Sequence, residues 1–281
     1  MPRIRKWLII CTVVRLVWGG WSGAAVWAET VGCTAINSIP FTITTPGIYC
    51  MTQEIETNLA NGTAIQIDAS HVVLDLNGHR LGNLLAGPGT NATGIHAEDR
   101  KNITIKNGTV RGFALGISLE GGANSGHIVE GIRADLNTRI GIDAEGTGIV
   151  IRNNLIVGTG GANADVIGIH VDGTENRVLN NQVVNTVAVG TNNAFAISVE
   201  NGSAVVDRNR VSNADLPSGG GSSYGIFIAA GGTNVLVVDN RITTMTFGVF
   251  YNGSSGKYGR NLTTGVTTPF SGGTASGGNN D

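Results

Sequence analysis

A five-residue pattern recurs along most of the chain and constrains its fold more than any other feature. It usually contains glycine, isoleucine, a variable residue, an apolar residue and an acid: GIHAE at 94–98, GISLE at 116–120, GIDAE at 141–145 and GIHVD at 168–172. Related stretches begin at 64, 196, 225 and 248, so the eight copies are spaced by 30, 22, 25, 27, 28, 29 and 23 residues. Self-similarity on this scale predicts a repeat architecture.

Each copy alternates apolar and polar residues, which is typical of a strand with one buried face. A second short strand follows in most repeats, as in NITIKN, GIVIRN, AVVDRN and NVLVVDN. Behind it an asparagine recurs at 154, 181, 209, 240 and 261. Asparagines stacked in parallel strands can continue a ladder of amide hydrogen bonds through a turn. The mature chain has no helical periodicity, so the pattern predicts a coil of parallel strands.

Two more segments, VVLDLNGHRLGN (72–83) and KNITIKNGTVRGF (101–113), carry a family resemblance together with the asparagine turns. They resemble the coils of right-handed parallel β-helix proteins of the pectin-lyase-like superfamily, over about 61–263. The resemblance implies an all-β fold, a single-stranded right-handed parallel β-helix (solenoid) of about eight coils with an N-terminal cap. That superfamily includes pectate lyases, polygalacturonases, alginate epimerases and lyases, phage tailspikes and non-catalytic surface proteins. The fold alone therefore selects no activity.

The two ends of the chain predict export and a capped rod. A basic start, an apolar run and AVWA before Glu29 are typical of a signal peptide over 1–28, with an uncleaved anchor as the alternative. Cleavage would leave Cys33 and Cys50, and in a secreted chain, periplasmic or extracellular, a disulfide is favoured over two free thiols. This bridge would tie an N-terminal cap over 29–60. The Gly/Ser/Thr-rich residues 264–281 are predicted to form a C-terminal tail.

Stacked strands would align their outward side chains in columns. The acid that ends each of six consecutive repeats forms one column: Asp68, Glu98, Glu120, Glu145, Asp172 and Glu200. Carboxylates one coil apart repel one another by roughly 1 kcal/mol in water, so each needs a turn amide, a basic partner or a cation. The one cofactor that this pattern suggests is Ca²⁺, with Glu145, Asp172 and Glu200 as its candidate ligands.

A second outward column carries the candidate catalytic residues His96, Asp143 and His170, which can move protons. The alternative is that these are ordinary surface residues. Further along the same column lie the candidate substrate-binding residues Ser198, Phe227 and Phe250. The two phenylalanines suit either a sugar platform or a shield for the last coils.

Three long polar loops, at 158–166, 186–195 and 213–224, precede neighbouring strands of the candidate site. Long loops on a rigid scaffold often carry function, and here they would form one wall of the site. Asp165 and Asp215 lie in these loops. They are candidate substrate-binding residues, with solvated turn residues as the alternative.

These features leave two functions open. The chain lacks the Asp-Pro-His-Asp and Gly-His-Gly signatures of epimerases and polygalacturonases, which favours a secreted, non-catalytic polysaccharide-binding or surface module. The alternative is a polysaccharide lyase or epimerase acting on an acidic uronate glycan along the outer strand face. A net charge of −2 without a basic run argues against a nucleic-acid partner. No membrane partner is expected after signal cleavage, and the oligomeric state stays open.

Overall fold

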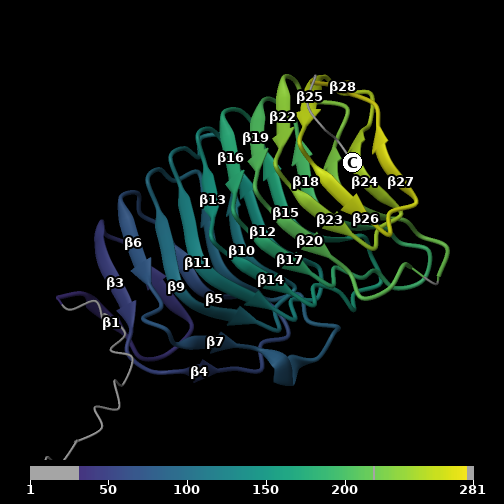
Figure 1. Ribbon diagram of the computed structural model, residues 1–281. Coiled ribbons are helices and arrows are strands. Elements are labelled where there is room, and N and C mark those ends of the chain that lie inside the picture. Colours follow the sequence, from purple (N-terminus) through teal and green to yellow (C-terminus); the bar gives the residue numbers. More distant parts are fainter. Residues whose placement is uncertain (1–31, 218, 277–281) are drawn as a thin grey trace, which may run out of the picture.

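The computed structural model describes residues 32–217 and 219–276, which wind into a parallel β-helix. The coils stack in chain order from β1 at the N-terminal end to β28 at the C-terminal end (Figure 1). The predicted signal peptide over 1–28 lies outside the described residues. Within those residues, no helix is long and apolar enough to cross a membrane.

One face of the β-helix is a parallel sheet of ten strands. Its strands are β2 (Phe41–Ile43), β5 (Thr63–Ile67), β8 (Thr93–Glu98), β10 (Leu115–Glu120), β12 (Ile140–Glu145), β15 (Val166–Asp172), β18 (Ala194–Glu200), β21 (Ser223–Ile228), β24 (Phe247–Tyr251) and β27 (Thr268–Ser271). Eight of them, β5 to β24, are the strands that the repeat predicts. The all-β parallel β-helix is therefore confirmed, and β2 and β27 add a strand at each end.

An eighteen-stranded sheet forms the other two faces. One run consists of β1 (Thr34–Ile36), β3 (Gly47–Met51), β6 (Val72–Asp75), β9 (Thr104–Arg111), β11 (Ile128–Asp135), β13 (Val150–Arg152), β16 (Asn176–Leu179), β19 (Ala204–Asp207), β22 (Val235–Val238), β25 (Gly256–Gly259) and β28 (Thr274–Ala275). The other consists of β4 (Ile55–Glu56), β7 (Arg80–Gly82), β14 (Leu155–Val157), β17 (Gln182–Val184), β20 (Arg210–Ser212), β23 (Arg241–Thr243) and β26 (Leu262–Thr264). The long strands β9 and β11 pair with both runs and join them. A single 3₁₀ turn, η1 (Leu84–Ala86), interrupts the described strands.

Stacked aliphatic side chains fill the space between the three faces. The isoleucine of the repeat is fully buried in successive coils, as at Ile95, Ile117, Ile142 and Ile169. Because the coils pair in register, each of these side chains packs against its counterparts above and below.

A steric constraint explains why glycine usually opens the repeat. A Cβ atom on Gly94 or Gly116 would lie 2.5 Å from the carbonyl oxygen of the equivalent glycine in the next coil, and one on Gly141 would lie 2.6 Å away. Alanine occupies this position in two coils, at Ala64 and Ala196, so a single methyl group can be accommodated with local adjustment. Close stacking of the backbones therefore explains why the pattern begins with a small residue.

The predicted asparagine ladder is confirmed at the turn between the two runs. The Nδ2 atoms of Asn154, Asn181, Asn209 and Asn240 each donate to the Oδ1 atom of the next asparagine over 3.0–3.1 Å. The residue before each ladder asparagine adopts a left-handed backbone conformation, with φ between 53° and 57° at positions 153, 180, 208, 239 and 260. The ladder thus satisfies backbone groups that the sharp turn removes from the strand ladder.

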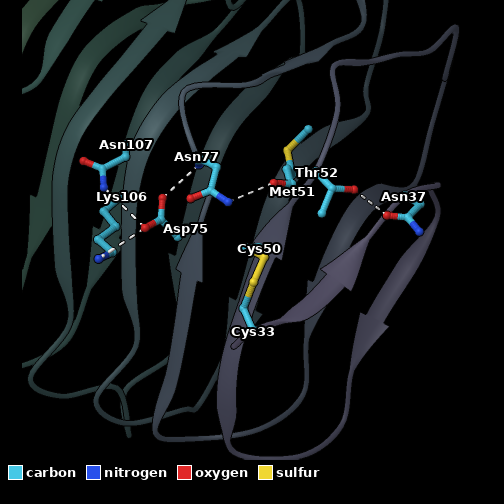
Figure 2. Close-up of a disulfide and its surroundings, with 9 residues drawn as sticks. All are labelled: Cys33, Asn37, Cys50, Met51, Thr52, Asp75, Asn77, Lys106 and Asn107. Carbon is cyan, nitrogen blue, oxygen red and sulfur yellow. Dashed lines mark hydrogen bonds and ion pairs between the residues drawn. A yellow bond between two sulfur atoms is a disulfide. The ribbon is translucent and has the colours of Figure 1, made fainter. Parts of the chain in front are cut away.

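The predicted Cys33–Cys50 disulfide is present and joins the residue before β1 to β3 (Figure 2). Residues of the predicted cap form strands, with β3 paired to β6 and β2 to β5. On the next rung, the buried carboxylate of Asp75 lies 3.2 Å from the Nζ atom of Lys106 (Figure 2). At the other end, β27 and β28 lie beyond residue 263 and extend both sheets.

Candidate functional site

The candidate site lies on the outer face of the ten-stranded sheet, where strand register aligns the predicted column. Adjacent strands pair His96 with Ser118, Ser118 with Asp143, and Asp143 with His170. The pairing continues from His170 to Ser198, then to Phe227 and Phe250. All the predicted members of this column therefore occupy equivalent positions in consecutive coils.

Asp143 and His170 form the central contact of the column. The Nδ1 atom of His170 lies 2.6 Å from the Oδ1 atom of Asp143, and both residues are buried. On the other side, the Nε2 atom of His170 lies 3.6 Å from the Oε1 atom of Glu200. That distance is too long for a hydrogen bond but suits an ion pair, so the imidazole lies between two carboxylates.

The two carboxylates keep His170 charged. Burial by itself would lower the pKa of His170, but the bond to Asp143 and the nearby Glu200 carboxylate outweigh it and raise the pKa from 6.5 to about 10. The contact with His170 in turn lowers the pKa of Glu200. His170 is therefore an imidazolium near neutral pH, able to donate a proton or to neutralise carboxylates but unsuited to act as a general base.

The structure does not bring His96 into this contact. His96 lies two coils before Asp143, with Ser118 between them, and it is only partly buried. Ser118 itself is buried and its hydroxyl donates to Glu120. Ser198, the neighbour of His170 on the other side, is also buried. Of the predicted catalytic residues, Asp143 and His170 thus form one pair, with Glu200 beside His170, and His96 does not contact them.

Members of the acid column have partners of the kinds expected for turns and pairs. Glu145 accepts a hydrogen bond from the Gly121 amide over 3.3 Å, and Asp172 accepts one from Asn201 Nδ2 over 3.0 Å. Burial raises the pKa of Glu145, although the Gly121 amide opposes this, and the nearby carboxylates, Asp143 first, add to the rise. Within 32–217 and 219–276, no three histidine, cysteine or acidic side chains cluster closely enough to hold a metal ion. Calcium binding by Glu145, Asp172 and Glu200 stays a prediction.

The long loops stack on one another as the strands do. Asn192 Nδ2 donates to Asn163 Oδ1 over 3.2 Å, and the Ser222 amide donates to Asn193 Oδ1 over 3.0 Å. Asp165 accepts a hydrogen bond from the Asn193 amide over 2.7 Å, so its carboxylate helps to hold two loops together. Asp215 is exposed on the third loop.

Five aromatic rings cover the C-terminal part of this face, and only two of them, Phe227 and Phe250, belong to the column predicted from the sequence. Phe227 and Phe250 stack with centroids 5.8 Å apart. A neighbouring column adds Phe195, Tyr224 and Phe247, whose rings also stack, with centroids 5.0 Å apart at each step. Tilted and edge-on contacts, with centroids 4.9–5.5 Å apart, join the two columns, and all five residues are partly exposed. We refer to these five residues as the aromatic platform.

A sequence signal for the three missed rings exists. The residue immediately before the repeat's small residue is large and apolar in six consecutive coils: Leu115, Ile140, Ile167, Phe195, Tyr224 and Phe247. Strand register aligns these six as a further outward column. The strand begins at or before this position in these coils, whereas the repeated five-residue pattern begins one residue later, at the small residue.

Comparison with known proteins supports the fold. No protein-family model and no curated protein sequence matches the chain. Among solved structures, tailspike protein 2 of Escherichia coli O157:H7 bacteriophage CAB120 is 15% identical with a TM-score of 0.57, over 79% of this chain and 32% of that one. The Dettilon tailspike protein is 14% identical with a TM-score of 0.56, over 83% of this chain and 56% of that one.

A DFA-IIIase from Arthrobacter chlorophenolicus A6 is 12% identical with a TM-score of 0.50, over 82% of this chain and 57% of that one. The chain thus spans between about a third and somewhat more than half of these three proteins. At these identities the likeness concerns the fold alone. It agrees with the parallel β-helix that the structure of this chain shows and that the sequence resemblance implies.

Proposed function

We infer that this protein is a secreted, non-catalytic module that binds polysaccharide along the outer face of its ten-stranded sheet. The observation that carries this proposal is the aromatic platform. Five partly exposed rings in two stacked columns form a contiguous apolar surface, and such surfaces commonly mark a binding site. Polysaccharides are the ligands that the resemblance to the pectin-lyase-like superfamily implies.

The platform suits sugar rings for a physical reason. The faces of pyranose rings are rich in C–H groups, and aromatic faces bind such groups by dispersion and by burial of apolar area. Tyr224 contributes a hydroxyl group beside the apolar surface, and Glu200, which is partly exposed, supplies a carboxylate at the end of β18, the strand that carries Phe195. Binding sites commonly combine an apolar, aromatic lining with a few polar groups that orient the ligand.

The charge state of His170 favours binding over catalysis. A lyase or epimerase needs a base to remove the proton next to the uronate carboxylate, and the raised pKa of His170 makes this side chain a poor base for that step. His170 lies between Asp143 and Glu200, and its positive charge instead reduces the repulsion among the carboxylates on this face. The Cys33–Cys50 disulfide supports the secreted location, because such bonds persist in oxidising compartments.

Binding is tested by removing part of the platform. Isothermal titration calorimetry across a glycan panel first identifies a polysaccharide that the unaltered protein binds. The double variant Phe227→Ala/Phe250→Ala is expected to bind this polysaccharide with an affinity lower by about tenfold or more. Leu236→Ala is the matched control, since Leu236 lies on β22 of another face and is 37% exposed. Equal affinities for the double variant and the control would contradict the proposal.

A polysaccharide lyase or epimerase is the second candidate, favoured by the 2.6 Å contact between Asp143 and His170. Proton NMR of polyuronates incubated with the protein tests it, because new unsaturated chain ends or altered epimer ratios would establish an enzyme. Such products, lost in Asp143→Asn and His170→Gln, would replace the binding proposal with the enzymatic one. Unchanged polyuronates would leave binding as the function.

A further inference from the structure

A cleft of about 890 Å³ opens at the asparagine-ladder turn, away from the aromatic platform. Its lining includes four arginines, Arg208, Arg210, Arg241 and Arg260, and one acid, Asp239, which together give a formal charge of +3. The chain as a whole carries a net charge of −2, so this cleft concentrates positive charge on a weakly acidic molecule. The amides of the ladder lie at its back, through Asn181, Asn209 and Asn240.

The four arginines differ in their partners. Arg260 binds Asp239 through two hydrogen bonds of 2.8 and 2.6 Å, and Arg208 lies 3.3 Å from Asp207. Arg210 and Arg241 are exposed, and neither makes an ion pair within the part of the chain that the structure describes. The cleft therefore offers two guanidinium groups that no carboxylate of the described chain neutralises.

Strand register places Arg210 and Arg241 at equivalent positions of adjacent coils, so they belong to one column. β20 and β23 pair Arg210 directly with Arg241. Gln182 precedes them in the column and Leu262 follows, and both also line the cleft. Two like charges about 4.8 Å apart repel one another by roughly 1 kcal/mol in water, and an anion bound across both guanidinium groups would relieve this repulsion.

We propose that this cleft is a binding site for acidic polysaccharide, with Arg210 and Arg241 receiving anionic groups on successive sugar units. Guanidinium groups bind carboxylate and sulfate through paired, charge-assisted hydrogen bonds. Their positions one coil apart, about 4.8 Å along the rod, present donors at a regular interval that suits a repeating polyanion. Gln182 adds an amide for sugar hydroxyls, and Leu262, 41% exposed, adds an apolar contact for a ring face.

This site is separate from the aromatic platform and binds by different chemistry. The platform recognises sugar faces whatever their charge, whereas the arginine cleft requires an anion. The two proposals can therefore fail independently of each other. Because the cleft is open to solvent, its contribution is expected to weaken as the ionic strength rises.

The experiment compares oligogalacturonate with its carboxyl-reduced, neutral counterpart by isothermal titration calorimetry at low and high salt, with sodium sulfate as a third titrant. The test variant is Arg210→Gln/Arg241→Gln. The matched control is Arg139→Gln/Arg177→Gln, which removes the same charge from two other exposed arginines that make no ion pair within the described residues. Phe227→Ala/Phe250→Ala reports on the platform in the same series.

The test variant is expected to lose at least about tenfold in affinity for oligogalacturonate at low salt, with a smaller dependence on salt. The control variant is expected to retain both properties, and binding of the neutral counterpart is expected to be the same in both. Equal losses in the two arginine variants would assign the effect to net charge and overturn the proposal. The proposal would also be overturned if the test variant bound oligogalacturonate with unchanged affinity, or if the unaltered protein did not bind oligogalacturonate.

Sodium sulfate separates a simple anion site from a polysaccharide site. Sulfate that binds as tightly as oligogalacturonate would show that the chain of sugars contributes nothing, and would overturn the assignment to polysaccharide. If only Phe227→Ala/Phe250→Ala loses binding of the neutral glycan, that result concerns the aromatic platform. The proposal for the arginine cleft is then decided by the arginine variants alone.

Discussion

His170 illustrates how a repeat can bring charged side chains into a costly arrangement and compensate for it. Its imidazole lies between the carboxylates of Asp143 and Glu200, beside the column that places an acid on the outer face of each of several coils. Without a cation at this point, Asp143 would be a buried carboxylate with other acids on adjacent strands. Breaking a buried ion pair by removing one partner typically costs 3–5 kcal/mol, because the other charge is left uncompensated.

We therefore expect His170→Gln to lower the free energy of unfolding by about 3 kcal/mol near pH 6. A histidine whose folded-state pKa exceeds its unfolded-state value stabilises the fold fully below the unfolded-state pKa. That contribution is lost as the pH rises through the folded-state pKa. The difference between the two proteins should accordingly shrink between pH 6.5 and about pH 10.

Urea denaturation at a series of pH values measures this difference. His96→Gln is the matched control, because His96 occupies the same column but is only partly buried and lies away from the Asp143 contact. A difference between His170→Gln and the unaltered protein that stays constant from pH 6 to pH 10 would contradict the assigned charge state.

At the scale of elements, the asparagine ladder joins consecutive coils at a turn where strand hydrogen bonds end. Asn209 is fully buried in the middle of this ladder. Its Oδ1 atom accepts from the Asn181 amide over 2.9 Å, and its Nδ2 atom donates to the Val178 carbonyl over 2.9 Å. Removing the side chain would leave these backbone groups without partners at a buried site.

Asn209→Ala is expected to lower the free energy of unfolding by about 3 kcal/mol, since at least two buried polar groups lose their bonds. Chemical denaturation followed by circular dichroism measures the change. Asn91→Ala serves as the control, because Asn91 is exposed and a substitution there should cost less than about 0.5 kcal/mol. Similar losses in both variants would mean that the ladder contributes no special stability.

At the scale of the whole molecule, each coil contacts mainly its neighbours, so the two ends of the rod need their own stabilisation. The Cys33–Cys50 disulfide supplies it at the N-terminal end, where β1 pairs with β3. The bond closes a loop with a sequence separation of 17 residues. Cross-linking a loop of this size removes unfolded-state entropy worth about 3 kcal/mol.

Replacing both cysteines, as Cys33→Ser/Cys50→Ser, is therefore expected to lower the stability of the N-terminal coil by about 3 kcal/mol. Hydrogen exchange measured for the strands β1 to β6 separates a local loss from a global one. The unaltered protein in the presence of a reductant should show the same change. Undiminished protection of these strands in both samples would contradict this role of the disulfide.

The regularity of the repeat explains how much of the fold and of the site the sequence alone could predict. A period-two alternation repeated at coil length determines which side chains face inward, and it places Asp143 beside His170 because a parallel register allows little else. The asparagine ladder could be predicted for the same reason, because an asparagine recurs at the same position of each repeat. Both depend on neighbouring coils being equivalent, and that equivalence is visible in the sequence.

Features that depend on the meeting of different columns required the tertiary structure. Phe195, Tyr224 and Phe247 precede the repeated pentapeptide, and only the folded strand shows that their rings contact Phe227 and Phe250. The arginine cleft likewise combines a strand column with the left-handed turn residues beside it. Register within one column is a property of the repeat, whereas contact between columns depends on rotamers and on how sharply each turn bends. By itself the sequence therefore determined the parallel β-helix and its columns, and only the tertiary structure decided which columns form a surface together.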